Sequence, residues 1–276
     1  MRQEEYRLTA KDGLKLFTQA WKPDKAATAL AVIVHGLGEH SGRYGHVAEA
    51  FIKNGIYTYS YDQRGHGRSE GPRGHTPTYG HLMDDLRLAL DHACRTAGGE
   101  LPVSLYGHSM GALEVIYFGL NNGEGVNGFI ATGLPLKLAS TTKFKALLAK
   151  ALNPVLPKLV MASGLEVAAL SRDPGVVKAY AEDPLVHDRI SIRLGMFLLE
   201  GAELALAGAG GWKQPLLVMH GGADRICDAD AAERFADMTG GKTTFKKWDG
   251  FYHEIHNEPG KEEVIQTMAD WMLARS

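Results

Sequence analysis

A single serine lies at the centre of a pentapeptide whose spacing is typical of nucleophilic catalysis. Residues 107–111 read Gly-His-Ser-Met-Gly, after the apolar run 103–106 and before the helical-looking segment 112–118. A serine in such a sharp strand-to-helix turn has a strained backbone, and the glycines let the strand and the helix pass close to it. Its hydroxyl then lies at a helix N-terminus, which favours an oxyanion. Ser109 is therefore the predicted nucleophile.

The serine needs a base to take its proton and an acid to orient that base. The run 215–220 is followed by Gly-Gly-Ala-Asp, which places Asp224 on a loop at the carboxyl end of a predicted strand. Asp228 and Asp230 lie close by and compete for the role. Asp230 has Glu233 three residues later, before an apolar helix, and this capping pattern favours a structural role. Asp224 is therefore the predicted acid.

The predicted base is His253, one of 12 histidines in the chain. His253 follows the last predicted strand, 243–248, and completes the order Ser, Asp, His expected of this architecture. His256 is the competing candidate, because it lies three residues later. His220 ends a predicted strand, which fits a buried position.

An oxyanion hole requires two backbone N–H donors. The N–H of Met110, directly after the nucleophile, is the first expected donor. The second is the N–H of Leu37, in the loop 35–38 that reads His-Gly-Leu-Gly after a predicted strand. Glycines in this loop allow its amides to turn inward. The alternative for the loop is a plain tight turn.

These residues require a scaffold that brings distant loops together at one edge of a sheet. Short apolar runs typical of strands buried on both faces occur at 29–34, 56–61, 103–106, 128–131 and 216–219. A hairpin is predicted for 6–9 and 14–18 around an Asp-Gly turn, and helices lie between the later strands, as at 45–54 and 79–96. This alternation predicts an α/β domain with its ligand crevice at the carboxyl ends of the strands.

Residues 134–209 break the alternation, because they contain no convincing strand and are mostly helical and apolar. A simple crossover would be far shorter. The segment is therefore predicted to be a helical cap inserted into a core made of residues 1–133 and 210–276.

One stripe within the predicted cap has apolar residues at helical spacing, with Lys143, Lys145 and Lys150 nearby. The stripe consists of Phe144, Leu147, Leu148, Ala151 and Leu152. It fits transient docking at a lipid surface, and it fits equally well packing on the core or lining an acyl tunnel.

The composition excludes several classes of function. The chain has 276 residues, 45% hydrophobic and 22% charged, with a net charge of −2, which gives no electrostatic case for nucleic-acid binding. No segment reaches the roughly 18 apolar residues of a membrane span, and the N-terminus is not a signal peptide. Cys94 and Cys227 have no metal-ligand spacing and fit two separate thiols. A cytoplasmic protein is expected, with a peripheral position at membranes as the open alternative.

Together these motifs resemble the monoacylglycerol lipases of the α/β-hydrolase superfamily. The resemblance is carried by 35–44 (HGLGEHSGRY), 62–71 (DQRGHGRSEG), 107–111, 223–228 (ADRICD) and 252–253 (YH). It implies the α/β-hydrolase fold, with a mostly parallel eight-stranded sheet flanked by helices. It also implies Ser109 as nucleophile, Asp224 as acid and His253 as base, without a cofactor or a metal ion. The oxyanion donors and a cap that admits an acyl chain follow from the same comparison.

The resemblance further implies a polar pocket for glycerol, built from Glu39, Arg43 and His256, with Tyr180 of the cap nearby. A site that hydrogen-bonds the free hydroxyls of glycerol discriminates against analogues that lack them. The alternative for Glu39 and Arg43 is a structural ion pair, and for Tyr180 it is packing within the cap. The cap matches the family mainly at 183–185, and Ala112 replaces a glycine common among relatives.

The expected reaction is hydrolysis of a monoacylglycerol to a free fatty acid and glycerol through an acyl-enzyme. A broader carboxylesterase or a lysophospholipase with the same triad is the first alternative. A non-catalytic lipid-binding protein is a minor alternative, because all three triad candidates are present in order. An epoxide hydrolase or dehalogenase is disfavoured, since that chemistry needs a carboxylate at position 109.

Overall fold

An eight-stranded sheet forms the centre of the structure, a computed structural model that describes residues 2–139 and 143–275, without the side chains of 143–146. The sheet order is β1-β2-β4-β3-β5-β6-β9-β10. The strands are β1 Arg2–Thr9, β2 Lys15–Lys22, β3 Ala29–Val34, β4 Ile56–Tyr61, β5 Val103–His108, β6 Gly128–Thr132, β9 Leu216–Gly221 and β10 Thr243–Trp248. β2 runs antiparallel to β1 and β4, and the remaining pairs are parallel. The predicted mostly parallel sheet is thus confirmed.

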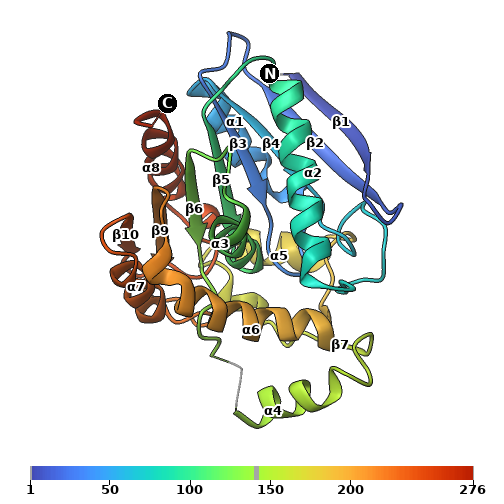
Figure 1. Cartoon of the computed structure of the whole chain (residues 1–276). Coiled ribbons are helices and arrows are strands. Elements are labelled where there is room, and N and C mark those ends of the chain that lie inside the picture. The colour runs from blue at the N-terminus through green and yellow to red at the C-terminus, as the bar shows by residue number, and fades with distance from the viewer. Residues whose placement is uncertain (1, 140–142, 276) are drawn as a thin grey trace.

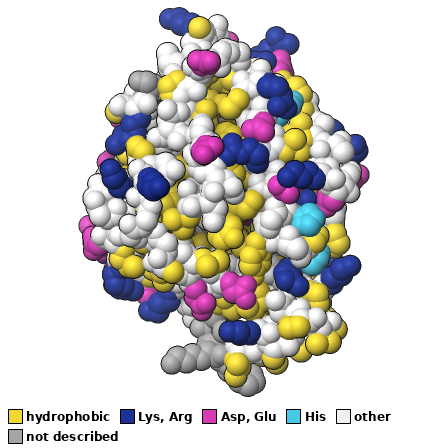
Figure 2. Space-filling model, in the orientation of Figure 1, with side chains coloured by type: hydrophobic (Ala, Val, Ile, Leu, Met, Phe, Trp, Pro, Cys, Tyr) yellow, Lys and Arg dark blue, Asp and Glu magenta, His cyan; other side chains and the backbone are white. Residues whose placement is uncertain are grey.

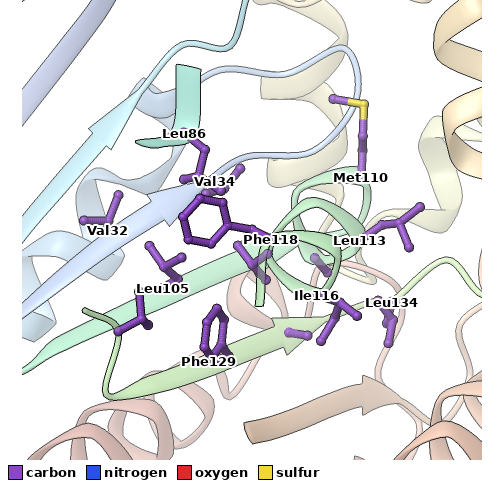
Figure 3. Packing of buried hydrophobic residues seen from close by; sticks show 14 of the residues in the cluster. Val32, Val34, Leu86, Leu105, Met110, Leu113, Ile116, Phe118, Phe129 and Leu134 are labelled. Atoms are coloured by element: carbon purple, nitrogen blue, oxygen red, sulfur yellow. The ribbon is translucent and has the colours of Figure 1, made fainter. Parts of the chain in front are cut away.

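Helices cover both faces of the sheet (Figure 1). One face packs against α1 (Gly45–Lys53) and α8 (Lys261–Leu273), and the other packs against α2 (Tyr79–Ala97), α3 (Met110–Asn122) and α7 (Ala229–Met238). Alternate strand residues point to opposite faces, so neighbours such as Val32 and Ile33 belong to different clusters. Figure 3 shows side chains of α3 packed against those of the central strands. This buried helix begins directly after Ser109.

The chain between β6 and β9 lies beyond the carboxyl ends of the parallel strands (Figure 1). Its elements are α4 Lys143–Leu152, β7 Val160–Ala162, the 3-10 helix η2 Val167–Ala169, α5 Pro174–Glu182, β8 Arg189–Ser191, α6 Ile192–Gly208 and the 3-10 helix η3 Ala209–Gly211. β7 and β8 pair as a separate two-stranded antiparallel sheet that was not expected from the sequence. Three-residue strands carry too few residues to produce an alternating pattern. The cap boundaries 134–209 stay a prediction.

The expectation that Asp230 caps α7 is wrong, because the N-cap is Asp228. The carboxylate of Asp228 accepts the backbone N–H groups of Asp230 and Ala231. Asp230 lies inside the first turn of the helix and pairs with Lys247, at 3.2 Å. Because Asp228 and Asp230 are both acidic and two positions apart, the sequence leaves the start of α7 uncertain by two residues.

Glu114 is an ionisable residue inside the core. It lies on α3 and is fully buried, and within the described part of the chain neither of its carboxyl oxygens has a hydrogen-bond partner. Burial, with a smaller contribution from the charge of Asp85, raises the pKa of Glu114 well above its usual value. The side chain is therefore protonated in the folded protein at neutral pH and ionised in the unfolded chain.

Glu114→Gln should make the protein more stable, and increasingly so as the pH rises. The pKa of Glu114 in the folded protein exceeds the unfolded value of about 4.3, so Glu114 takes up a proton on folding. The free energy of unfolding of the native protein therefore falls as the pH rises above that value. The stability gain of the variant should rise by up to about 1.4 kcal/mol per pH unit. Urea denaturation of both proteins between pH 5 and pH 8 measures this difference in the free energy of unfolding. Glu203→Gln, an exposed glutamate of α6, is the matched control. A gain that does not change with pH would contradict the assignment.

Candidate active site

The backbone at Ser109 has the strained geometry that the pentapeptide predicts. Its φ is 51° and its ψ is −119°, and within the described ranges Ser109 is the only non-glycine residue with positive φ. A Cβ on Gly107 would lie 2.2 Å from the carbonyl oxygen of Gly111, and a Cβ on Gly111 would lie 2.1 Å from that of Val34. Glycine is therefore required at both positions. The turn presents the serine at the N-terminus of α3.

Asp224 and His253 meet on two loops at the carboxyl ends of β9 and β10. The Oδ2 atom of Asp224 lies 2.7 Å from Nδ1 of His253, and both side chains are buried. The Oδ1 atom accepts the backbone N–H groups of Ile226 and Cys227, at 2.8 and 3.0 Å. Asp224 is thus held rigidly, and of the three competing aspartates it is the one that contacts His253.

His220 is a further partner of Asp224 that sequence reasoning did not assign. Its Nε2 atom lies 3.0 Å from Oδ2 of Asp224 and 3.2 Å from the carbonyl oxygen of Cys227. Both neighbours are acceptors, so we assign a hydrogen to Nε2. The position of His220 at the end of β9, four residues before Asp224, is the signal that could have identified it.

The electrostatics of the pair favour an imidazolium beside a carboxylate. Burial alone would raise the pKa of Asp224, but attraction to His253 and hydrogen bonds from His220 and His253 hold it well below its usual value. Burial alone would lower the pKa of His253, but Asp224 raises it well above its usual value. The site thus stabilises the charge that His253 would carry after accepting a proton.

Ser109 and His253 line the same cavity, which has a volume of about 700 Å³. The hydrogen bonds among the described residues do not include one between these two side chains. In free enzymes this contact is often long and tightens when substrate binds. The cavity is therefore the common space in which the two groups can act on one ligand.

Leu37 and Met110, the expected oxyanion donors, also line this cavity. Met110 is the first residue of α3, so its N–H has no acceptor within the helix. The loop of Leu37 is fixed from both sides: the N–H of Gly36 donates to Oε1 of Glu39 at 2.6 Å, and the carbonyl oxygen of Gly38 accepts the N–H of His187 at 2.9 Å. A segment beyond the strand ends therefore holds the loop in place.

An ionic cluster lies at the polar end of the cavity and includes Glu254, which the sequence did not reveal. The guanidinium of Arg43 donates to both carboxyl oxygens of Glu254, at 2.7 Å each, and to Oε2 of Glu39. The Arg43 guanidinium also lies 4.7 Å from the ring centre of Tyr180, on α5. Glu39, Glu254 and Tyr180 line the cavity, whereas Arg43, which was expected to contact the ligand, does not belong to the lining. We call Glu39, Arg43 and Glu254 the carboxylate–arginine cluster.

His256 differs from the expectation of a direct ligand contact, because it does not belong to the lining of the cavity. It is fully buried in the 3-10 helix η4 (Ile255–Asn257) and stacks on Tyr44, with ring centres 5.0 Å apart. Its Nδ1 atom lies 3.1 Å from the hydroxyl of Tyr106. Burial lowers the pKa of His256 well below its usual value. The residue packs behind the cavity wall.

Most of the remaining wall of the cavity is apolar. It is supplied by α4, the strands β7 and β8, and α6, through Leu148, Leu152, Met161, Ile190, Ile192, Leu198 and Leu199. The part of the wall that these elements supply is therefore hydrophobic, while the part that carries Ser109, His253, Glu39 and Glu254, which we call the polar end, is not. An amphipathic ligand with a single long apolar chain matches this division.

One group of three metal-ligating side chains was found in the described part of the chain, and it coincides with the proposed catalytic pair. The ligand atoms of Asp224, Cys227 and His253 lie within 4.8 Å of one another. Burial raises the pKa of the Cys227 thiol, so it stays protonated, whereas a metal would require the thiolate. The group fits a hydrogen-bonded pair better than a metal site.

A search of the described helices found none that is long and apolar enough to cross a membrane.

The profile of the family described as Hydrolase_4, serine aminopeptidase, S33, matches residues 25–260. A monoacylglycerol lipase from Mycolicibacterium smegmatis is 30% identical over 98% of this chain and 97% of its own. Phospholipase YtpA from Bacillus subtilis is 33% identical over 89% of this chain and 95% of its own. The crystal structure of a monoacylglycerol lipase from Paleococcus ferrophilus has a TM-score of 0.85 and 35% identity, and covers 99% of this chain and 100% of its own. The chain spans 29% of an uncharacterized abhydrolase domain-containing protein of Dictyostelium discoideum.

Proposed function

The chain belongs to the Hydrolase_4 family, as a serine hydrolase of the monoglyceride lipase and esterase group with the α/β-hydrolase fold, and from that premise we propose that its substrate is a monoacylglycerol. The observation that carries the proposal is the divided cavity. Its apolar wall fits one acyl chain, and its polar end lies beside Ser109. Glycerol bound there would have two free hydroxyls to hydrogen-bond with Glu39 and Tyr180.

The proposed reaction proceeds through an acyl-enzyme. His253 takes the proton of Ser109 as the hydroxyl oxygen attacks the ester carbonyl carbon. The N–H groups of Leu37 and Met110 hold the oxyanion, and each such donor is typically worth about 3 kcal/mol. His253 then gives its proton to the departing alcohol, and the C–O bond breaks. Water, activated by the same imidazole, releases the fatty acid in the second half of the reaction.

Asp224 orients His253 in this scheme and stabilises its cation. Its Oδ2 atom accepts the hydrogen on Nδ1, at 2.7 Å, which leaves Nε2 of His253 to face the serine. The scheme needs no cofactor or metal ion. We also propose that residues 134–209 act as the cap, since elements of this segment supply the apolar wall.

A panel of esters with one common acyl chain tests the substrate. We expect the highest kcat/KM for the 1-monoacylglycerol, above the di- and triacylglycerol, the lysophospholipid and the p-nitrophenyl ester. Equal or better turnover of the lysophospholipid would favour the alternative of a lysophospholipase. Similar kcat/KM values for all the esters, whatever their alcohol, would favour a broad carboxylesterase. No turnover of any ester would favour a lipid-binding protein.

We propose that the outer face of the cap makes transient contact with lipid surfaces. Leu147 is 67% exposed and Val155 is 76% exposed. Further exposed apolar side chains nearby are Leu156, Leu159 and Val160. Figure 2 shows hydrophobic side chains at the end of the molecule where α4 and β7 lie. Phe144 of the predicted stripe and the nearby Lys143 and Lys145 lie outside the described side chains.

Co-sedimentation with liposomes tests this contact. A fraction of the protein should pellet with the vesicles, and the double variant Leu147→Glu/Val155→Glu should reduce that fraction severalfold, because two charges would have to enter the lipid surface. Leu204→Glu, at an exposed leucine of α6, is the matched control. Complete recovery of the native protein in the supernatant would contradict the proposal.

A further inference from the structure

Two glutamates, Glu39 and Glu254, line the polar end of the cavity, and both pair with the guanidinium of Arg43, which is not part of the lining. Arg43 binds Glu39 and Glu254 at once, and the side chains of the three residues are exposed by only 10%, 3% and 2%. Among the described residues, Arg43 provides the only salt bridge to either glutamate. One positive and two negative charges leave a surplus negative charge in the carboxylate–arginine cluster.

The neighbouring histidines do not compensate this surplus. Burial, together with the charge of His253, lowers the pKa of His108 to about 3. Burial also lowers the pKa of His256 well below its usual value. Both rings are therefore neutral at physiological pH. His253 and Asp224 balance each other when both are charged, so they leave the surplus unchanged.

Glu254 is held rigidly in the cluster. Its backbone N–H donates to the carbonyl oxygen of Leu170 at 2.8 Å, and its Oε2 atom accepts from Nδ2 of Asn257 at 2.8 Å. Glu254 directly follows His253 in the chain and belongs to the lining of the cavity, and Arg43 and Asn257 hold its carboxylate in place. A fixed charge in a partly desolvated pocket acts on a ligand much more strongly than one in water.

We infer that Glu254 determines leaving-group selectivity: it makes the polar end of the cavity net negative, so that esters of neutral or cationic alcohols are accepted and esters whose alcohol carries a phosphate are rejected. The inference rests on the proposed function, because it requires the alcohol of the substrate to occupy the polar end. It adds a charge criterion that hydrogen bonding to hydroxyls does not provide. A phosphate monoester brings up to two negative charges towards the cluster.

The test compares three esters of one short acyl chain, all below their critical micelle concentrations. Their alcohols are glycerol, choline and glycerol phosphate, which are neutral, cationic and anionic. The native protein should favour the first two over the third in kcat/KM by roughly tenfold or more. Glu254→Gln leaves Arg43 paired with Glu39 alone, which removes the surplus charge. This variant should lose most of that preference, whereas Glu254→Asp, which keeps the charge, should retain it.

Asp85→Asn is the matched control. Asp85 accepts two hydrogen bonds from Arg64, at 2.6 and 2.9 Å, in a second buried ion pair that does not line the cavity. This variant is compared with the others in stability, and it should change the rates with all three esters by one common factor. If Glu254→Gln does not fold, Glu39→Gln removes the other carboxylate of the cluster and should give the same change in the ratio.

Two results would overturn the inference. The first is a native protein that hydrolyses the phosphate-bearing ester as readily as the glycerol ester. The second is a Glu254→Gln variant that slows all three esters equally, as a purely structural role would. If the native protein hydrolyses the choline ester well and the glycerol ester poorly, the monoacylglycerol proposal fails. The charge selectivity is then judged from the choline and phosphate esters alone.

Discussion

Ser109→Ala should abolish ester hydrolysis while leaving the fold intact. Without the hydroxyl no acyl-enzyme forms, and loss of a serine nucleophile typically lowers kcat by roughly 10⁴- to 10⁶-fold. Alanine keeps the Cβ atom, so the strain of the turn is unchanged, and the backbone hydrogen bond from the Ser109 N–H to the Thr132 carbonyl oxygen remains. A p-nitrophenyl ester assay combined with a thermal melt by circular dichroism measures both effects.

Ser104→Ala is the matched control, because this serine lies on β5, the strand that leads to Ser109, and does not line the cavity. It should keep nearly full activity. Turnover by Ser109→Ala at more than a trace of the native rate would exclude Ser109 as the nucleophile.

Asp224→Asn should lower kcat by about 10⁴-fold with little effect on the overall fold. The amide would no longer hold the Nδ1 hydrogen of His253, so the wrong tautomer would face the serine. The variant also loses the negative charge that raises the pKa of His253. The ionisation on the acidic side of the pH–rate profile should therefore move to lower pH, because His253 would lose its proton more easily.

Asp228→Asn separates the acid from its nearest rival. Asp228 caps α7, and asparagine caps a helix about as well as aspartate, so this variant should lose only the exposed ion pair with Lys137, about 0.5 kcal/mol of stability, and retain its rate. Loss of activity in Asp228→Asn together with an active Asp224→Asn would reverse the assignment.

The features that were predictable from the sequence are those with local causes. All residues of β3 and β4 are buried because both faces of these strands are covered, and the run that became β3 is apolar throughout. The turn at Ser109 was recognisable because Gly107 and Gly111 are required by close backbone contacts. The order of the proposed nucleophile, acid and base then follows from the order of the parallel strands. Hydrophobic periodicity and glycine spacing within a few residues are enough to predict these strands and this turn.

The features that were missed depend on residues far apart in the chain. Glu254 pairs with Arg43, which lies 211 positions away in the sequence, and no local pattern connects the two residues. The spacing of His256 suggested that it shares a face with His253, but the 3-10 helix η4 turns it behind the cavity wall. The contact of His187 with Gly38 likewise joins the oxyanion loop to a distant segment. Such contacts are set by tertiary packing.

Labelling with a fluorophosphonate, followed by mass spectrometry of the peptides, is the most direct measurement of whether Ser109 is activated by His253. The native protein should carry one phosphonyl group, on Ser109. His253→Gln should label more slowly by orders of magnitude, and Ser109→Ala should not label at all. An unlabelled native protein, or a label on a different residue, would contradict the proposed mechanism.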